Sequence, residues 1–117
     1  FGIPGSYLVV FARGEMVTCH LRGDADAIHA ALVQAYKSQP FVSVLPLGSP
    51  PPDTRHVRGT NECRIGVFPD RASGRVIVFG VIDNLVKGSS GQAIQNLNLM
   101  MGWDQALGLD VLLPLFP

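Results

Sequence analysis

Apolar and polar residues alternate over the first part of the chain, and this alternation predicts two strands. Residues 6–11 (SYLVVF) are rich in β-branched and aromatic side chains, and residues 15–22 (EMVTCHLR) alternate so that Cys19 and His20 fall on opposite faces. A period of two is typical of a strand, because successive side chains point to opposite sides of the sheet. We expect residues 12–14 to turn the chain between these two strands.

Residues 24–38 (DADAIHAALVQAYKS) follow the period of an amphipathic helix instead. Its apolar stripe consists of Ile28, Ala31, Leu32, Ala35 and Tyr36. Asp24 is placed to cap the first turn, and Pro40 cannot continue the helix. The pattern therefore predicts one helix between the second strand and the next apolar run.

The middle of the chain predicts a strand, a stiff loop and a hairpin. Residues 41–47 (FVSVLPL) are a short apolar run, and three consecutive prolines keep residues 48–55 out of any sheet. Residues 62–70 and 75–83 flank the short segment RASG, a spacing typical of a hairpin. The second of these strands is apolar nearly throughout, so we expect it to be buried on both faces.

A second helix is predicted over residues 91–101, and Gly102 is placed to end it. Its apolar stripe consists of Ala93, Ile94, Leu97 and Met101. We expect the apolar, proline-broken residues 110–117 (DVLLPLFP) to pack as an extended segment. The order of elements predicts an α+β fold, with a mostly antiparallel or mixed sheet and two helices packed on it.

Charge and composition limit the classes of partner. Nine Lys plus Arg balance nine Asp plus Glu, so no basic surplus is available for nucleic acid or an anionic membrane. No apolar run approaches the about 20 residues that span a bilayer, and no signal peptide is recognisable at the start of the chain. Cys19 and Cys63 lie outside any metal-type spacing, which favours free thiols in the cytoplasm.

The residue types of familiar catalytic centres are present but not assembled. His20 lies on the opposite face of its strand from Cys19 and is not its base, so both Cys19 and Cys63 are expected to be core residues. The three histidines are far apart in the sequence, without carboxylates at ligand spacing. The sequence therefore predicts no catalytic residue and no metal ligand within this chain.

One segment has the layout of a ligand site. A buried strand ends at Asp83-Asn84, the segment KGSSG follows, and then the second helix begins. A strand, loop and helix in this order can present backbone N–H groups and a helix N-terminus to a ligand, although the Walker A and dinucleotide-binding patterns are missing. Asp83 is expected to accept backbone N–H bonds. Residues 84–91 either contribute to a site built mostly by another segment or form a plain helix-entry loop.

The same segment carries a family resemblance. IDNLVKGSSGQAIQNLNLMMGW, RGTNECRIGVFPD before it and the closing GLDVLLPLFP resemble the C-terminal part of N-acetyl-γ-glutamyl-phosphate reductase, of the semialdehyde dehydrogenase family. The resemblance extends over residues 12–117. It implies a two-domain, cytoplasmic, oligomeric enzyme, a dimer or tetramer, that uses NADPH (NADP) to reduce N-acetylglutamyl 5-phosphate to the 5-semialdehyde in arginine biosynthesis.

This resemblance divides the chain into two parts. Residues 1–83 would be part of the substrate and dimerisation domain, and residues 84–117 a cofactor-closing loop, helix and tail that dock on a Rossmann domain outside this chain. The resemblance implies cofactor contacts from Asn84, Leu85, Lys87 and Gly88. The glycines of residues 88–91 would let chain and cofactor approach closely.

The family's catalytic motifs, Gly-Cys-Tyr-Pro and His-x-His-x-Pro-Glu, do not occur in this chain. Neither Cys19 nor Cys63 therefore inherits the nucleophile's role, and the isolated chain is expected to be inactive. Two alternatives stay open. One is the carrier-linked aminoadipyl-phosphate reductase of lysine biosynthesis, and the other is a non-catalytic dimerisation or binding domain.

Overall fold

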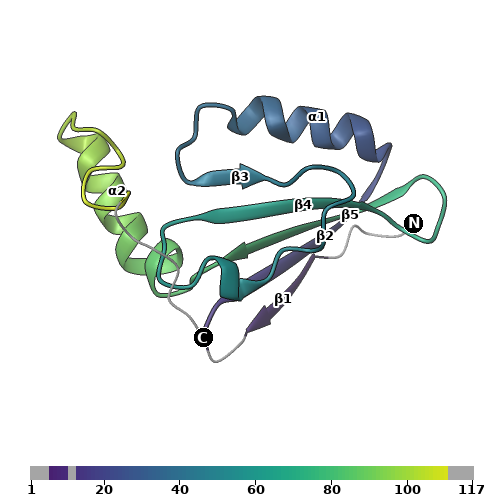
Figure 1. Cartoon of the computed structure of the whole chain (residues 1–117), viewed down its shortest axis with the longest axis horizontal. Coiled ribbons are helices and arrows are strands. Elements are labelled where there is room, and N and C mark those ends of the chain that lie inside the picture. Colours follow the sequence, from purple (N-terminus) through teal and green to yellow (C-terminus); the bar gives the residue numbers. More distant parts are fainter. Residues whose placement is uncertain (1–5, 11–12, 111–117) are drawn as a thin grey trace.

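The computed structural model describes residues 6–10, through their backbone, and residues 13–110. Five strands form one mixed sheet in the order β1-β2-β5-β4-β3 (Figure 1). The strands are β1 (Ser6–Val10), β2 (Glu15–Arg22), β3 (Val42–Val44), β4 (Cys63–Pro69) and β5 (Arg75–Ile82). All neighbours pair antiparallel except β3 and β4, which run parallel.

The predicted elements are present, with small changes at their ends. The hairpin is confirmed as β4 and β5, and the first two strands pair as β1 and β2. The strand predicted over residues 41–47 is limited to β3, because Pro46 has no N–H to donate to the sheet. The α+β class is confirmed.

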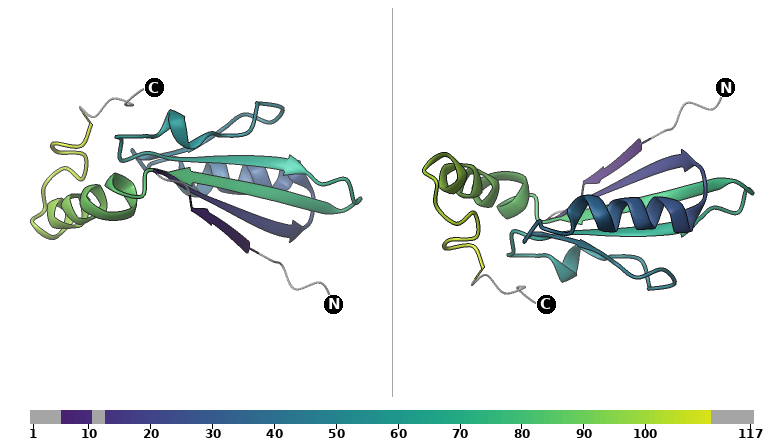
Figure 2. Two further views of the ribbon diagram at one scale, coloured as in Figure 1. Left: turned by 90° about the horizontal axis from the view of Figure 1, so that it is seen from below. Right: turned by 90° about the horizontal axis from the view of Figure 1, so that it is seen from above.

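Helix α1 (Ala25–Tyr36) begins and covers the sheet as its sequence predicts. Asp24 caps it, since its Oδ2 accepts a hydrogen bond of 2.9 Å from the Ala27 N–H. The helix lies along one face of the sheet (Figure 2). Leu32 and Tyr36 line a groove of about 300 Å³ between the helix and the strands, whose opposite wall includes Val78.

The other face of the sheet is covered by the proline-rich loop. Pro52 is buried and lies against Gly66, where a Cβ atom would be 3.0 Å from the Pro52 Cδ. On this face the rings of Phe68 and Phe79 meet edge to face, with centroids 5.3 Å apart. The stiff loop is thus part of the core, and it ends in a short 3₁₀ turn, η1 (Thr54–His56).

Strand β5 occupies the middle of the sheet. Val76 and Val81, on opposite faces, are almost wholly buried, while the residues between them are half-buried. The predicted burial on both faces therefore holds near the ends of the strand and is incomplete at its centre.

Helix α2 (Gly91–Met100) does not cover a face of the sheet. It continues a π-helical turn, η2 (Val86–Ser90), and extends beyond the end of β5 (Figure 2). Gly102, with a φ of 71°, follows its end as predicted. Among the described residues, no helix is both long and apolar enough to span a membrane. The extended tail predicted over residues 110–117 lies outside the described residues from residue 111 onward.

Candidate functional site at the end of β5

Three segments that are distant in the sequence meet at the Asp83 carboxylate, at the end of β5. Asp83 is completely buried. Its Oδ1 accepts hydrogen bonds from the N–H groups of Leu85 (2.8 Å) and Val86 (3.3 Å). Its Oδ2 accepts one from the Gly59 N–H and one from Arg13 Nε (3.1 Å), and Arg13 Nη2 lies 3.0 Å away. The predicted role of Asp83 as an acceptor of backbone N–H bonds is confirmed.

This arrangement keeps Asp83 ionised. Burial alone would raise the pKa of its carboxyl group, because a charge is poorly solvated inside a protein. The hydrogen bonds from Gly59 and Leu85 and the Arg13 guanidinium outweigh burial, and together they lower the pKa of Asp83. A buried, hydrogen-bonded carboxylate therefore lies between the end of β5 and the start of the helical segment.

The segment expected to be a loop over residues 84–91 is helical. In η2 the Ser90 N–H bonds to the Leu85 carbonyl at 3.1 Å, and the Gly91 N–H bonds to the Val86 carbonyl, both five residues back. The helix therefore starts near Leu85, and Asp83 already accepts its first N–H groups. In front of these first N–H groups, where the strand–loop–helix layout allows a ligand, lies a carboxylate of the chain itself.

Asn84 stands next to this carboxylate with one end of its amide engaged. Its Oδ1 accepts a 2.7 Å hydrogen bond from the Gly14 N–H, in the turn between β1 and β2. The side chain is half-buried. With Oδ1 held by the chain, Nδ2 is the group that Asn84 offers as a donor to another molecule.

The other three residues predicted to contact a cofactor point in different directions. Leu85 is 54% exposed, and Gly88 is exposed as well. Lys87 turns back toward the protein, where its Nζ donates to Gln95 Oε1 at 2.7 Å and lies 5.6 Å from the centroid of the Phe41 ring. Desolvation lowers the pKa of Lys87. Leu85 and Gly88 are therefore open to solvent, whereas Lys87 is held against Gln95 and Phe41.

The absence of a side chain at Gly91 is required by packing within the protein. A Cβ atom at Gly91 would contact Asn61 Oδ1, and it would lie 2.8 Å from the Val86 side chain. At Gly88 a Cβ atom would meet nothing closer than 3.4 Å. Of these two glycines, only Gly88 leaves room for a Cβ atom, which would make ordinary contacts there.

Helix α2 turns polar side chains inward. Gln95 is buried, and its Oε1 also accepts from Asn61 Nδ2 at 3.0 Å, while its Nε2 donates to Gln105 at 3.0 Å. Asn98 is buried and donates to the Leu107 carbonyl at 3.0 Å. Amide pairs therefore fix the helix to the loop before β4 and to the turn that follows the helix.

The apolar stripe of α2 faces outward. Its predicted members Ile94, Leu97 and Met101 are 44%, 50% and 56% exposed, and the neighbouring Met100 is 84% exposed. Trp103 adds to this side with 50% exposure. Contiguous apolar surface of this kind is typical of an interface with another part of a protein.

Neither cysteine is placed as a reactive thiolate beside Asn84. Cys19 and Cys63 are both free and line the groove under α1. Burial raises the pKa of the Cys63 thiol, and the nearby Lys87 charge only partly opposes this shift, so the thiol stays protonated. Within residues 13–110 no group of three or more His, Cys, Asp or Glu side chains is arranged to hold a metal ion.

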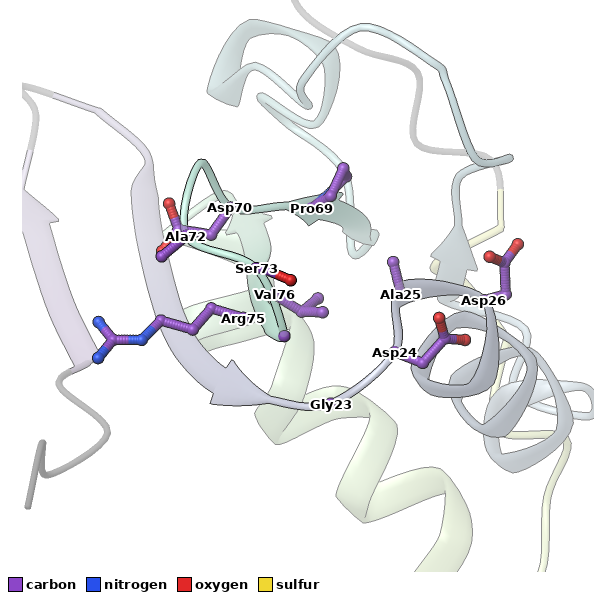
Figure 3. A pocket seen from close by; sticks show the side chains of 11 residues that line it. Gly23, Asp24, Ala25, Asp26, Pro69, Asp70, Ala72, Ser73, Arg75 and Val76 are labelled. Carbon is purple, nitrogen blue, oxygen red and sulfur yellow. The ribbon is translucent and has the colours of Figure 1, made fainter.

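A separate hollow of about 560 Å³ lies at the opposite end of the sheet, between the start of α1 and the turn of the β4–β5 hairpin (Figure 3). Asp24 and Asp26 line one side of it, and Arg75 points away from them. The Asp24 carboxylate is occupied as the helix cap, and Asp70 accepts from the Arg71 N–H at 2.7 Å. Two of the three carboxylates that line the hollow, Asp24 and Asp70, are therefore engaged by nearby backbone N–H groups.

Three residues that hold Asp83 and Asn84 are ones for which the sequence predicts no functional role. Arg13 and Gly14 lie in the turn before β2, and Gly59 lies in the loop before β4. Arg13 and Asp83 are 70 positions apart in the sequence, so no local spacing indicates their contact. The glycine at position 14 is the one sequence signal at this place, and in the structure it adopts a φ of 108°.

Comparison with known proteins identifies the fold. A family model described as the semialdehyde dehydrogenase dimerisation domain matches residues 5–84. The chain belongs to this family. The resemblance found in the sequence is thereby confirmed at the level of the family.

The relatives of this dimerisation domain are longer proteins. The N-acetyl-gamma-glutamyl-phosphate reductases of Jannaschia sp. (strain CCS1) and Paracoccus denitrificans (strain Pd 1222) are 53% and 51% identical over 103 and 111 residues. These matches cover 88% and 95% of this chain, but 30% and 32% of those proteins. The chain thus spans about a third of the length of these curated relatives.

Solved structures support the fold of the dimerisation domain. An aspartate semialdehyde dehydrogenase II from Vibrio cholerae aligns with a TM-score of 0.59 at 21% identity, over 77% of this chain and 28% of that one. A probable aspartate-semialdehyde dehydrogenase from Pseudomonas aeruginosa aligns equally well, over 76% of this chain and 27% of that one. At this level of identity the likeness concerns the fold alone.

Proposed function

We propose that this chain is the C-terminal portion of an NADPH-dependent reductase that converts N-acetylglutamyl 5-phosphate to N-acetylglutamate 5-semialdehyde in arginine biosynthesis. The observation that carries the proposal is an identity of about half over nearly the whole chain to proteins named N-acetyl-gamma-glutamyl-phosphate reductase. The activity belongs to the whole protein, because this chain spans about a third of those relatives.

In this proposal the end of β5 forms one wall of the NADP site. The dinucleotide supplies the hydride, and most of its binding surface lies on a domain outside this chain. Asn84 offers its Nδ2 amide to the cofactor, since Gly14 already holds its Oδ1. Leu85 and Gly88 supply exposed apolar and backbone surface, and Lys87 keeps a positive charge close behind them.

The division of the chain follows the same lines. Residues 1–83 belong to the substrate and dimerisation domain, and the family match over residues 5–84 supports this part. Residues 84–117 close over the cofactor and dock on the Rossmann domain. The outward apolar side of α2 supports a docking role, because it exposes Leu97, Met100 and Trp103 together.

The functional protein is proposed to be a cytoplasmic homo-oligomer. The family is described as a dimerisation domain, which supports association between copies of the chain; a dimer and a tetramer both satisfy this description. Cys19 and Cys63 are free thiols, as proteins of a reducing cytosol usually keep them.

The related reductase of lysine biosynthesis, which acts on a carrier-linked aminoadipyl phosphate, is the second candidate. Its substrate differs in length and in the carrier, features recognised by residues outside this chain. The names of the relatives favour the N-acetylglutamyl substrate. A non-catalytic binding domain is the third candidate, and the identity that includes the Asn84 segment weighs against it.

The test is turnover by the full-length protein in the reverse direction. N-acetylglutamate semialdehyde, phosphate and NADP are supplied, and NADPH formation is followed by absorbance. We expect turnover with this semialdehyde and little with the carrier-linked aminoadipate semialdehyde. Turnover with the second substrate alone assigns the enzyme to the lysine pathway. Absence of turnover with both contradicts the reductase proposal.

A further inference from the structure

The turn between β1 and β2 bonds to Asp83 and Asn84, the two residues that follow β5. Arg13 Nε and Nη2 lie 3.1 and 3.0 Å from Asp83 Oδ2, and the Gly14 N–H donates to Asn84 Oδ1 at 2.7 Å. Gly14 is buried, and a Cβ atom there would be 2.6 Å from Thr54 Cβ. The turn is therefore fixed between the proline-rich loop and the Asn84 side chain.

Asp83 fixes the same region from the other side. Its carboxylate bonds the Gly59 N–H of the loop before β4 and the Leu85 N–H that follows Asn84. The backbone on both sides of Asn84, and the Gly14 N–H that orients its amide, are thus tied to one buried carboxylate. Because the Gly14 N–H is a donor, the Asn84 amide keeps this bond only with Oδ1 toward the turn and Nδ2 away from it.

We propose that Asp83 and Arg13 are positioning residues that set the orientation of the Asn84 amide toward the cofactor. This inference rests on the proposed function. Neither side chain reaches the cofactor in this proposal. The Arg13–Asp83 ion pair holds the turn so that the Gly14 N–H meets Asn84 Oδ1, and the amide then presents its Nδ2 donor in a single direction.

A purely structural role for the ion pair makes a different prediction. Loss of a buried ion pair lowers the fraction of folded enzyme, which reduces the apparent kcat without changing KM or any isotope effect. Loss of positioning slows the hydride transfer itself. The primary deuterium isotope effect with NADPH deuterated at the transferred position then rises, because hydride transfer becomes a slower part of the cycle.

The experiment uses the full-length protein with Arg13→Met, Asp83→Asn and Asn84→Ala. We expect each variant to lower kcat by about 10- to 100-fold and to raise the isotope effect, since a small misplacement of reacting groups has effects of this size. KM for the acyl phosphate should change little. The double variant Arg13→Met/Asn84→Ala should be no worse than Asn84→Ala alone, because both changes remove the same orientation.

A matched control is available in the same chain. Arg75 is exposed and lies at the start of β5, at the far end of the strand from Asp83. Arg75→Met therefore removes an arginine away from the Asn84 region, and we expect unchanged kinetics. If Asp83→Asn does not fold, Arg13→Met decides the question, because the Arg13 side chain is 33% exposed and its loss is better tolerated.

The two proposals fail in distinguishable ways. A full-length wild-type protein without reductase activity overturns the proposed function and, with it, this inference. An active wild-type protein whose Arg13→Met variant keeps the wild-type isotope effect overturns the positioning role alone.

Discussion

Two glycines at the start of the long helical segment serve different purposes. Gly91 is buried against Asn61 and Val86, and no side chain fits there without moving one of them. Gly88 is exposed, and a Cβ atom there would make only ordinary contacts, one of them with Asn84 Cβ at 3.8 Å. The sequence alone assigns both glycines to the cofactor, whereas the structure separates a packing requirement from a surface.

We expect Gly91→Ala to destabilise the full-length protein by about 1–3 kcal/mol, the usual cost of forcing an extra carbon into a packed site. Gly88→Ala should leave stability unchanged or raise it, since alanine favours a helix. Gly88→Ala should also raise KM for NADPH, because Gly88 lies in the proposed cofactor site. Denaturant unfolding and NADPH titration of the two variants measure both effects. Equal losses of stability in both variants would contradict this separation.

At the residue scale the sequence is informative where chemistry and local position agree. Asp83 follows an apolar strand and precedes a helix, so its role as an acceptor of N–H bonds is predictable. Its ion pair with Arg13 is not, because it joins two turns 70 positions apart that only the sheet brings together. The orientation of the Asn84 amide depends on the same long-range contact and stays hidden for the same reason.

At the scale of the element, helix α2 shows what periodicity can and cannot reveal. Its limits and its apolar stripe are predicted correctly from spacing and from Gly102. Periodicity does not predict which side of the helix faces the protein. The buried side carries Gln95 and Asn98, whose amides bond to other amides and carbonyls. A stripe of apolar residues indicates an interface, and among the described residues of this chain the stripe of α2 stays exposed.

A substitution in the exposed stripe of α2 should have different effects in the 117-residue chain and in the full-length protein. In the 117-residue chain, Leu97→Glu should change stability by less than about 0.5 kcal/mol, as at other exposed positions, and should reduce self-association in sedimentation velocity. In the full-length protein the same change should lower stability and activity, since a charge enters the proposed interface with the Rossmann domain.

Asn96→Glu is the control, because Asn96 is an exposed polar residue on the same helix. It should affect neither self-association nor activity. Full activity of Leu97→Glu in the long protein would show that α2 does not dock there.

At the scale of the whole molecule, the sequence predicts the α+β class and the β4–β5 hairpin but not the order of the strands. Strand β5 lies between β2 and β4, and its partner β2 comes more than 50 positions earlier in the sequence. The parallel edge pair of β3 and β4 is likewise set by how α1 and the proline-rich loop cross the sheet. These arrangements depend on packing between distant segments, for which a single sequence carries no local signal.

The architecture also determines what the chain does alone. Its candidate cofactor edge consists of one half-buried amide, one leucine and a short π-helical turn, which bury little of a dinucleotide. The Cys63 thiol is held protonated by burial, and the family's nucleophile and histidine motifs are missing from the sequence. We therefore expect the 117-residue chain to consume no NADPH with N-acetylglutamyl phosphate, while the full-length protein does. Adding the separately produced upstream part should restore turnover if α2 docks on it, because that part would bring the nucleophile to the Asn84 edge. Turnover by the 117-residue chain alone would place a catalytic group among its own residues and contradict the assignment of a cofactor-closing role.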